Sequence, residues 1–290
     1  MPDYLNGESL LADAVQRLGP LGQGRAILIV EGATDKAVFA GWCSDSVAQI
    51  VVAGGKNLAL SAHRHMTDDD RCRIAVIVDC DGNAGVLCGS PNLVVTTFND
   101  LEADLMMADR LRRVIYLLVG GGVQSDERLA AICDDVVARA IGAAKGIETV
   151  RHAARNAGIQ LRGHPRDISF GRLRHRGDID VEVEVALEEL ARVHALSPPR
   201  TTLTAEEIDR VQRALPGRVV PLDACSGKVL IAAAGGVLNM DFGVPKRVLG
   251  AFDDLVRTSV AVDAELREGL GVVRRLRRWE AAHGVRLLAA

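Results

Sequence analysis

Aromatic residues are scarce in this 290-residue sequence: they make up 3% of the chain, while hydrophobic residues of all kinds make up 48%. The core must therefore be built mainly from Ala, Val, Leu and Ile side chains. The sequence contains no apolar run long enough for a membrane span, and no basic segment followed by an apolar one opens it. We therefore expect neither a signal peptide nor a transmembrane helix.

Paired cysteines are also lacking, because the six cysteines are scattered and none forms a Cys-x-x-Cys motif. This pattern argues against a zinc ribbon and against a disulfide framework. A reducing cytoplasm is the location that we expect. Ordinary nucleotide-binding signatures are missing too: the sequence has neither Gly-x-x-x-x-Gly-Lys-Ser/Thr nor Gly-x-Gly-x-x-Gly.

Excess positive charge is absent, since the formal net charge is −3. A nucleic-acid-binding protein of this composition would need a local basic patch. One candidate patch lies near the C-terminus, where a predicted helix carries four closely spaced arginines: Arg274, Arg275, Arg277 and Arg278. These arginines either contact nucleic acid or form an ordinary solvated helix face.

The sequence does contain a regular alternation of strand and helix patterns. Apolar runs at 25–32, 48–55, 73–82 and 92–100 are separated by helical patterns, and another helix is expected to start near Asp100. Uniformly apolar strands that alternate with helices predict an α/β fold with a parallel sheet flanked by helices. A mainly helical C-terminal region should follow.

The expected organisation has four parts. Residues 1–24 form a helical lead-in and 25–120 the α/β domain. A helical extension with an edge strand at 178–190 covers 121–197, and a mainly helical region covers 203–290 after a linker of sequence SPPRTT.

Carboxylates follow the predicted strands at the point where each strand ends. Glu31 follows the first strand, Asp79 and Asp81 the third, and Asp100 and Glu102 the fourth. Because the carboxyl ends of parallel strands share one edge, these groups are expected to converge. Converging carboxylates repel one another unless a cation compensates, and hard oxygen ligands suit Mg²⁺ or Mn²⁺. Each motif alone could be a helix or turn cap, but the two together favour a metal site.

A Gly54-Gly55-Lys56 turn follows the second strand and opens a helix. Its backbone N–H groups and its lysine can bind a phosphate, although two glycines are common in such turns for steric reasons alone. A third segment, DACSGKVL at 223–230, has no histidine nearby, so we interpret it as a helix cap rather than a nucleophile site.

Four ordered segments, ILIVEGATDKAVF, VVAGGKNLAL, IAVIVDCDGN and TTFNDLEADL, together resemble the TOPRIM domain of primases, topoisomerases and OLD nucleases. The closest resemblance is to the TOPRIM nucleases of anti-phage defence systems, such as the effector subunit of the PARIS system. It covers about residues 25–110 and continues more faintly in DISFGRL and CSGKVL.

The resemblance implies a toxic, Mg²⁺- or Mn²⁺-dependent nuclease that cleaves nucleic acid, tRNA rather than DNA. It implies that Glu31 is a metal ligand or general base and that Asp79 and Asp81 form the Asp-x-Asp metal site. Glu102 and Asp100 would match the acidic motif after the fourth strand, and Lys56 the lysine of the Gly-Gly-Lys turn. It further implies a homodimer and a partner ATPase of the ABC/SMC type.

The sequence departs from the family pattern at two positions. Asn83 and Thr97 stand where aspartates are expected, so one or two metal ions are possible. These departures leave room for a catalytically inactive, partner-binding protein of the same fold. A haloacid-dehalogenase-type phosphatase with Asp79 as nucleophile is a further alternative. A covalent topoisomerase mechanism needs a nucleophilic tyrosine. It is disfavoured, because the only tyrosines are Tyr4, near the N-terminus, and Tyr116, in the apolar stretch VIYLLV.

Overall fold

The computed structural model describes most of the chain and divides it into two compact units. The sheet unit comprises residues 1–108 and 257–290, and the helical unit comprises residues 109–256. The described residues are 4–18, 25–43, 48–81, 89–107, 111–119, 125–170, 173, 183–249 and 264–289.

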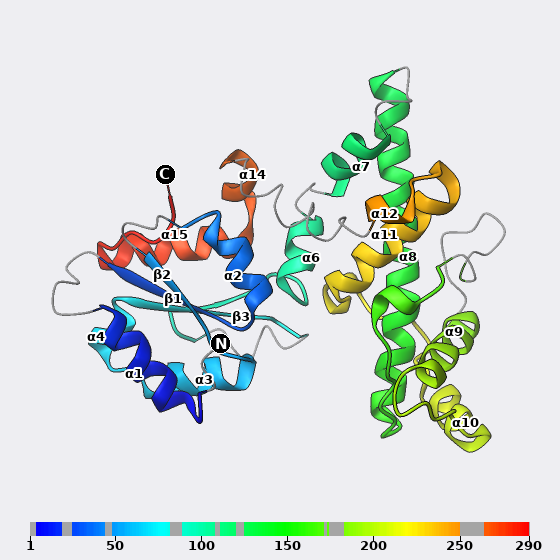
Figure 1. Ribbon diagram of the computed structural model, residues 1–290, viewed down its shortest axis with the longest axis horizontal. Helices are drawn as coiled ribbons and strands as arrows, with labels where there is room; N and C mark the ends of the chain where they lie inside the picture. Colours follow the sequence, from blue (N-terminus) through cyan, green and yellow to red (C-terminus); the bar gives the residue numbers. More distant parts are fainter. Residues whose placement is uncertain are drawn as a thin grey trace. The chain divides into compact units, whose positions relative to one another are not determined.

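The sheet unit is built on four parallel strands in the order β2-β1-β3-β4 (Figure 1). The strands are β1 (Ala26–Val30), β2 (Ala48–Val52), β3 (Ile74–Val78) and β4 (Leu93–Val95). All five residues of β1 and of β3 are buried, as expected of central strands covered on both faces. The predicted α/β class with a parallel sheet is therefore confirmed.

Helices cover both faces of this sheet (Figure 1). On one face lie α1 (Gly7–Leu18), α3 (Lys56–His65) and the short α4 (Asp68–Arg71); α2 (Ala33–Ala40) and α15 (Gly271–His283) lie on the other. Leu10 and Ala14 of α1 pack in one buried cluster with Ile27 and Ile29 of β1. The remaining helices of the sheet unit are α6 (Leu101–Leu105) and α14 (Ala264–Gly269).

The C-terminal segment returns to the sheet unit and is anchored there. Trp279 of α15 is buried, and its Nε1 donates a hydrogen bond of 3.0 Å to the carbonyl oxygen of Arg71. Further on, Ala289 N donates to the carbonyl of Trp42 at 2.7 Å. The predicted region 203–290 is thus divided between the two units, which differs from the expected boundaries.

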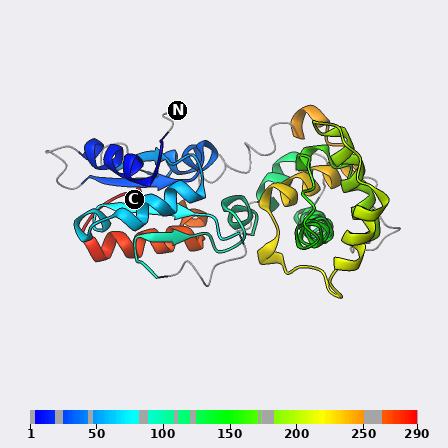
Figure 2. The same ribbon diagram turned by 90° about the horizontal axis from the view of Figure 1, so that it is seen from below.

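The helical unit is arranged around one long helix, α8 (Asp126–Asn156), which Figure 2 shows end-on. Around α8 lie α7 (Leu111–Val119), α9 (Val183–Leu196), α10 (Ala205–Ala214) and α11 (Gly227–Phe242). Shorter elements are α12 (Lys246–Leu249) and the 3-10 turns Pro165–Asp167 and Leu222–Ala224. The predicted boundaries at 120 and 197–203 both differ from the division found, since the helical unit runs from 109 to 256.

Two further expectations concern helices: the edge strand at 178–190 that becomes helical, and the absence of a membrane-spanning helix. Residues 183–190, predicted to continue an edge strand and then become helical, already belong to α9, while 178–182 lie outside the described residues. None of the helices in the described ranges is both long and apolar enough to cross a membrane.

Candidate functional site at the carboxyl edge of the sheet

Acidic side chains meet where β1, β3 and β4 end. We call Glu31, Asp79, Asp81, Asp100 and Glu102 the acidic rim. Glu31 Oε1 accepts a hydrogen bond of 2.7 Å from the backbone N–H of Asp79, which ties the end of β1 to the end of β3. Glu31 therefore faces the neighbouring strand instead of capping α2, whose N-cap is Gly32.

Asp79 is the rim carboxyl group whose pKa burial and the neighbouring charges raise most clearly. Burial, together with the negative charges of Glu31, Asp100, Asp35 and Glu102, raises its pKa from 3.8 to about 9. Burial also raises the pKa of Glu31, although the hydrogen bond from Asp79 N and the charge of Lys56 act in the opposite direction. The acids thus crowd Asp79 with negative charge, a situation that a bound cation would relieve.

The Gly54-Gly55-Lys56 turn brings one positive charge to the rim. Gly54 has φ 86° and Gly55 has φ 140°, both in the region that favours glycine. Lys56 is the first residue of α3, and its Nζ donates to the carbonyl oxygen of Asp79 at 2.5 Å and to Asp81 Oδ2 at 2.9 Å. Asp81 is exposed and has φ 48°, so its carboxylate lies at the open side of the rim.

Helix α6 contributes the two remaining acids. Asp100 is the N-cap residue of α6, and its Oδ1 accepts from Ala103 N at 2.8 Å, as the predicted helix start implied. The backbone N–H of Leu101 donates a hydrogen bond of 3.2 Å to Asp79 Oδ1, so the first turn of α6 also contacts Asp79. Asp100 and Glu102 are both buried, which is unusual for carboxylates without a functional or structural reason.

Two acids near the rim escaped the sequence analysis as site residues. Asp104 is buried and accepts hydrogen bonds from the backbone N–H groups of Thr97 at 3.0 Å and Phe98 at 2.6 Å. The segment TTFNDLEADL, which contains Asp100 and Glu102, also contains Asp104, so a sequence signal was available. Asp35 lies in the first turn of α2, where its Oδ2 accepts from Gly32 N at 2.8 Å, and its charge contributes to the raised pKa of Asp79.

The predicted arginine patch is divided by the structure. Arg275 donates to Thr97 Oγ1 at 2.9 Å, in the loop that precedes α6. Burial raises the pKa of Asp104, and the charge of Arg275 offsets part of that rise. Arg277 forms ion pairs with Glu268 at 2.9 Å and Glu280 at 3.0 Å, which indicates a structural role. Arg274 and Arg278 are exposed, as nucleic-acid-binding residues would be.

The acidic rim has the chemistry of a metal site, but its carboxylates are not gathered into a complete set of ligands. Among the described residues, no three His, Cys, Asp or Glu side chains are gathered tightly enough to hold one. Magnesium, however, usually keeps several waters and is bound through only one or two carboxylates. The donors here are all oxygen atoms, and the excess negative charge at Asp79 fits such an ion. The predicted Asn83 position lies outside the described residues.

No protein-family model matches the chain, and a comparison with curated proteins also finds no match. Function is therefore inferred from the residues of the rim. The rim joins carboxylates able to hold a hard cation to a lysine at the start of a helix. That combination can bind a phosphate group and stabilise the negative charge that develops on it.

Proposed function

We propose that the sheet unit is a TOPRIM-like nuclease domain that hydrolyses phosphodiester bonds of nucleic acid with Mg²⁺ or Mn²⁺. One observation carries the proposal. Burial at the end of β3, together with the charges of Glu31, Asp100, Asp35 and Glu102, raises the pKa of Asp79 to about 9. Strand ends in α/β sheets are the usual location of such sites.

Each residue of the rim has a definite task in this proposal. Glu31 and Asp79 would hold one ion, and Asp81, Asp100 and Glu102 are the candidates for a second. When bound, the metal polarises the phosphate and lowers the pKa of an attacking water. Lys56 orients the Asp79–Asp81 loop through its hydrogen bonds and offers its charge to the scissile phosphate. The N–H of Gly54 already donates to the carbonyl oxygen of Glu31 at 3.0 Å, so the predicted phosphate contact falls to Gly55, which has no atom within 4 Å of its Cβ position.

Substrate and partners follow from the resemblance to the anti-phage TOPRIM nucleases. We propose tRNA as the substrate in preference to DNA, a toxic effector role in anti-phage defence, and a cytoplasmic location. A homodimer held inactive by an ABC/SMC-like ATPase completes the proposal. Arg274 and Arg278, exposed on α15, are the candidates for contacts with the nucleic-acid backbone.

Cleavage assays test the proposal directly. The purified chain is incubated with a mixed tRNA pool and with plasmid DNA, in Mg²⁺, Mn²⁺ or EDTA. We expect metal-dependent cleavage of tRNA that Glu31→Gln abolishes and that Glu8→Gln, an exposed change on α1, leaves intact. Absence of cleavage both alone and with the partner ATPase, or equal cleavage by Glu31→Gln, contradicts it.

Two alternatives have different signatures. A partner-binding protein without catalysis is favoured by one observation, the absence of a tight three-ligand group among the described residues. It predicts no metal binding and no cleavage under any condition. A phosphatase with Asp79 as nucleophile is disfavoured, because Glu31, whose Oε1 accepts from Asp79 N at 2.7 Å, would have no role in it. Retention of radiolabelled phosphate on Asp79 would support the phosphatase.

A further inference from the structure

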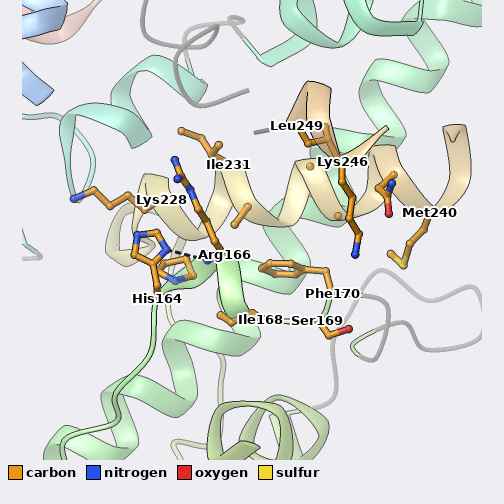
Figure 3. Close-up of a pocket in the computed structure, with 15 residues that line it drawn as sticks. His164, Arg166, Ile168, Ser169, Phe170, Lys228, Ile231, Met240, Lys246 and Leu249 are labelled. Atoms are coloured by element: carbon orange, nitrogen blue, oxygen red, sulfur yellow. Dashed lines mark hydrogen bonds between the residues drawn. The ribbon is translucent and has the colours of Figure 1, made fainter. Parts of the chain in front are cut away.

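The helical unit contains a pocket of about 400 Å³ that the acidic rim does not use. Its walls come from the 3-10 turn Pro165–Asp167 and the residues after it, from the outer face of α11, and from α12 (Figure 3). Every residue that lines the pocket belongs to the helical unit. A volume of this size suits a small organic ligand.

The charged residues that line the pocket are positive. Arg166, Lys228 and Lys246 line it together with His164, and no Asp or Glu is found among its described lining residues. Lys228 and Lys246 are exposed and, within the described part of the chain, make no ion pair. Asp167 follows Arg166 directly in the sequence, but it accepts a hydrogen bond from His164 N at 3.2 Å and does not line the pocket. The pocket is therefore suited to anions.

The middle of the pocket is apolar. Ile231 of α11 and Phe170 are buried residues that line it, and Met240 lies at its far end (Figure 3). Phe170 packs directly on Gly236, where an added Cβ would lie 2.6 Å from the Phe170 Cβ. Ala232 and Gly235 also line the pocket, and their small size leaves its volume open.

The turn that presents Arg166 is firmly held. His164 Nδ1 accepts from Arg166 N at 3.1 Å, and Pro165 begins the 3-10 turn. Arg192 of α9 donates to the carbonyl of Asp167 at 2.9 Å. Ser169 N donates to the buried Glu189 at 2.6 Å. These hydrogen bonds preorganise the backbone of the turn that forms this wall of the pocket.

The positive groups stand at both ends of the apolar floor. Figure 3 shows His164, Arg166 and Lys228 at one end, and Lys246 with Met240 at the other. Lys228 and Met240 are twelve residues apart on α11, which corresponds to about 18 Å along the helix axis. A ligand with one anionic head, such as a fatty acid, would leave one cationic end without a partner.

We propose that this pocket binds a short nucleotide ligand whose phosphates reach both cationic ends and whose flat bases lie on the Phe170–Ile231 floor. Aromatic and apolar surfaces beside positive charge are how proteins hold unpaired bases. The ligand is either a free dinucleotide or a segment of single-stranded RNA, which share this chemistry. Binding here requires no hydrolysis at the acidic rim, so the two proposals can fail separately.

Binding is measured on the full chain in EDTA, where metal-dependent cleavage cannot occur. The probes are fluorescein-labelled di-uridylate carrying a 5′-phosphate and a twelve-nucleotide single-stranded RNA, followed by fluorescence anisotropy. Two pocket variants are compared with wild type: the double charge reversal Lys228→Glu/Lys246→Glu, and Ala232→Phe, which fills the pocket and keeps its charges. Arg218→Glu, an exposed change in the same unit outside the pocket, is the matched control.

We expect both pocket variants to raise the Kd at least tenfold and Arg218→Glu to leave it within twofold. If Ala232→Phe does not fold by circular dichroism, Ser169→Phe at an exposed lining position, which also adds bulk and no charge, replaces it. Tighter binding of the RNA than of the dinucleotide identifies an RNA strand as the source, and the reverse identifies a free nucleotide. The proposal is overturned if wild type binds neither probe, if the filled pocket binds as wild type does, or if Arg218→Glu loses as much affinity.

Discussion

At the scale of single residues, Asp79 is the least favourable group of the acidic rim. Its carboxyl group is held among other acids, and its pKa lies far above the ordinary value of 3.8. Active sites commonly contain such groups, because the arrangement that serves the ligand does not serve stability. The same feature makes Asp79 a sensitive probe of the site.

Replacement of Asp79 by Asn should stabilise the metal-free chain. A carboxyl group whose pKa is higher in the folded than in the unfolded chain stabilises the fold at low pH. That contribution is lost as the pH rises from about 4 to about 9, so stability falls over this range. The amide of Asn does not titrate and avoids the loss. We therefore expect Asp79→Asn to raise the melting temperature by several degrees, more at pH 9 than at pH 6 (about 2–4 °C per kcal/mol).

Thermal unfolding in EDTA at both pH values checks this expectation. Asp126→Asn, an exposed change in the first turn of α8, serves as the control and should not reproduce the pH-dependent gain. A melting temperature below that of wild type for Asp79→Asn at pH 9 would show that the surrounding charges do not destabilise the ionised carboxylate of Asp79.

Lys56 is expected to serve the reaction rather than metal binding. Lys56→Met removes the hydrogen bonds to the carbonyl of Asp79 and to Asp81 and leaves every carboxylate in place. Loss of one charge-stabilising donor typically lowers kcat by about 10²–10³-fold. We expect that loss in the tRNA cleavage assay, with the Mn²⁺ affinity retained in calorimetry. Loss of Mn²⁺ binding with cleavage would instead assign Lys56 a role in building the rim.

At the scale of elements, the turn between β2 and α3 decides where Lys56 lies. Gly55 has φ 140°, and no atom stands within 4 Å of a Cβ built on it. Backbone strain is therefore the only cost of a side chain there, about 1–3 kcal/mol. We expect Gly55→Ala to lower the free energy of unfolding by that amount and to weaken cleavage.

Gly89→Ala is the matched control for this change. Gly89 also has open space around its Cβ position, but no positive φ is found there. Urea denaturation of the two variants should show a loss for Gly55→Ala alone. Equal stability of the two would mean that the turn relaxes without strain and that Lys56 needs no glycine before it.

Elements set by local patterns could be predicted from the sequence. The apolar runs gave the four strands, and the Asp100 cap placed the start of α6 correctly. Contacts between distant segments could not be predicted. His63 of α3 is buried, and its Nε2 lies 3.1 Å from Oδ1 of Asn92, the residue before β4. Such a pairing depends on how α3 packs against the sheet, not on the helix itself.

The candidate site was predictable to a similar extent. A parallel sheet brings its strand ends to one edge, so Glu31 and Asp79 could be expected to converge, and they do. The separate fates of Arg275 and Arg277 could not be expected, because both depend on the position of α15 on the sheet. Side-chain partners across about 180 residues leave no periodic signal in the sequence.

At the scale of the whole molecule, the sheet unit is completed by the far end of the chain. Trp279 is 1% exposed, and α15 packs near β4. Truncation of a buried tryptophan typically costs about 3–5 kcal/mol. We expect Trp279→Ala to destabilise the sheet unit by this amount, while Arg278→Ala, one residue earlier and exposed, changes stability by less than about 0.5 kcal/mol.

Chemical denaturation separates these two variants. The same stability for both would mean that α15 contributes little to the sheet unit. The sequence could not reveal this return, since the predicted boundary at 203 marks a change in local pattern and not in packing. Residues 109–256 belong to the other unit, so the chain crosses between the units twice.

A Mn²⁺ titration tests most directly whether the acidic rim is a metal site. Isothermal calorimetry is performed on wild type, Asp79→Asn, Glu31→Gln and the exposed control Glu8→Gln, all at pH 7.5. We predict binding of one or two Mn²⁺ ions by wild type and Glu8→Gln, and at least tenfold weaker binding by Asp79→Asn and Glu31→Gln. No binding to wild type, or equal binding by all four proteins, would contradict the account.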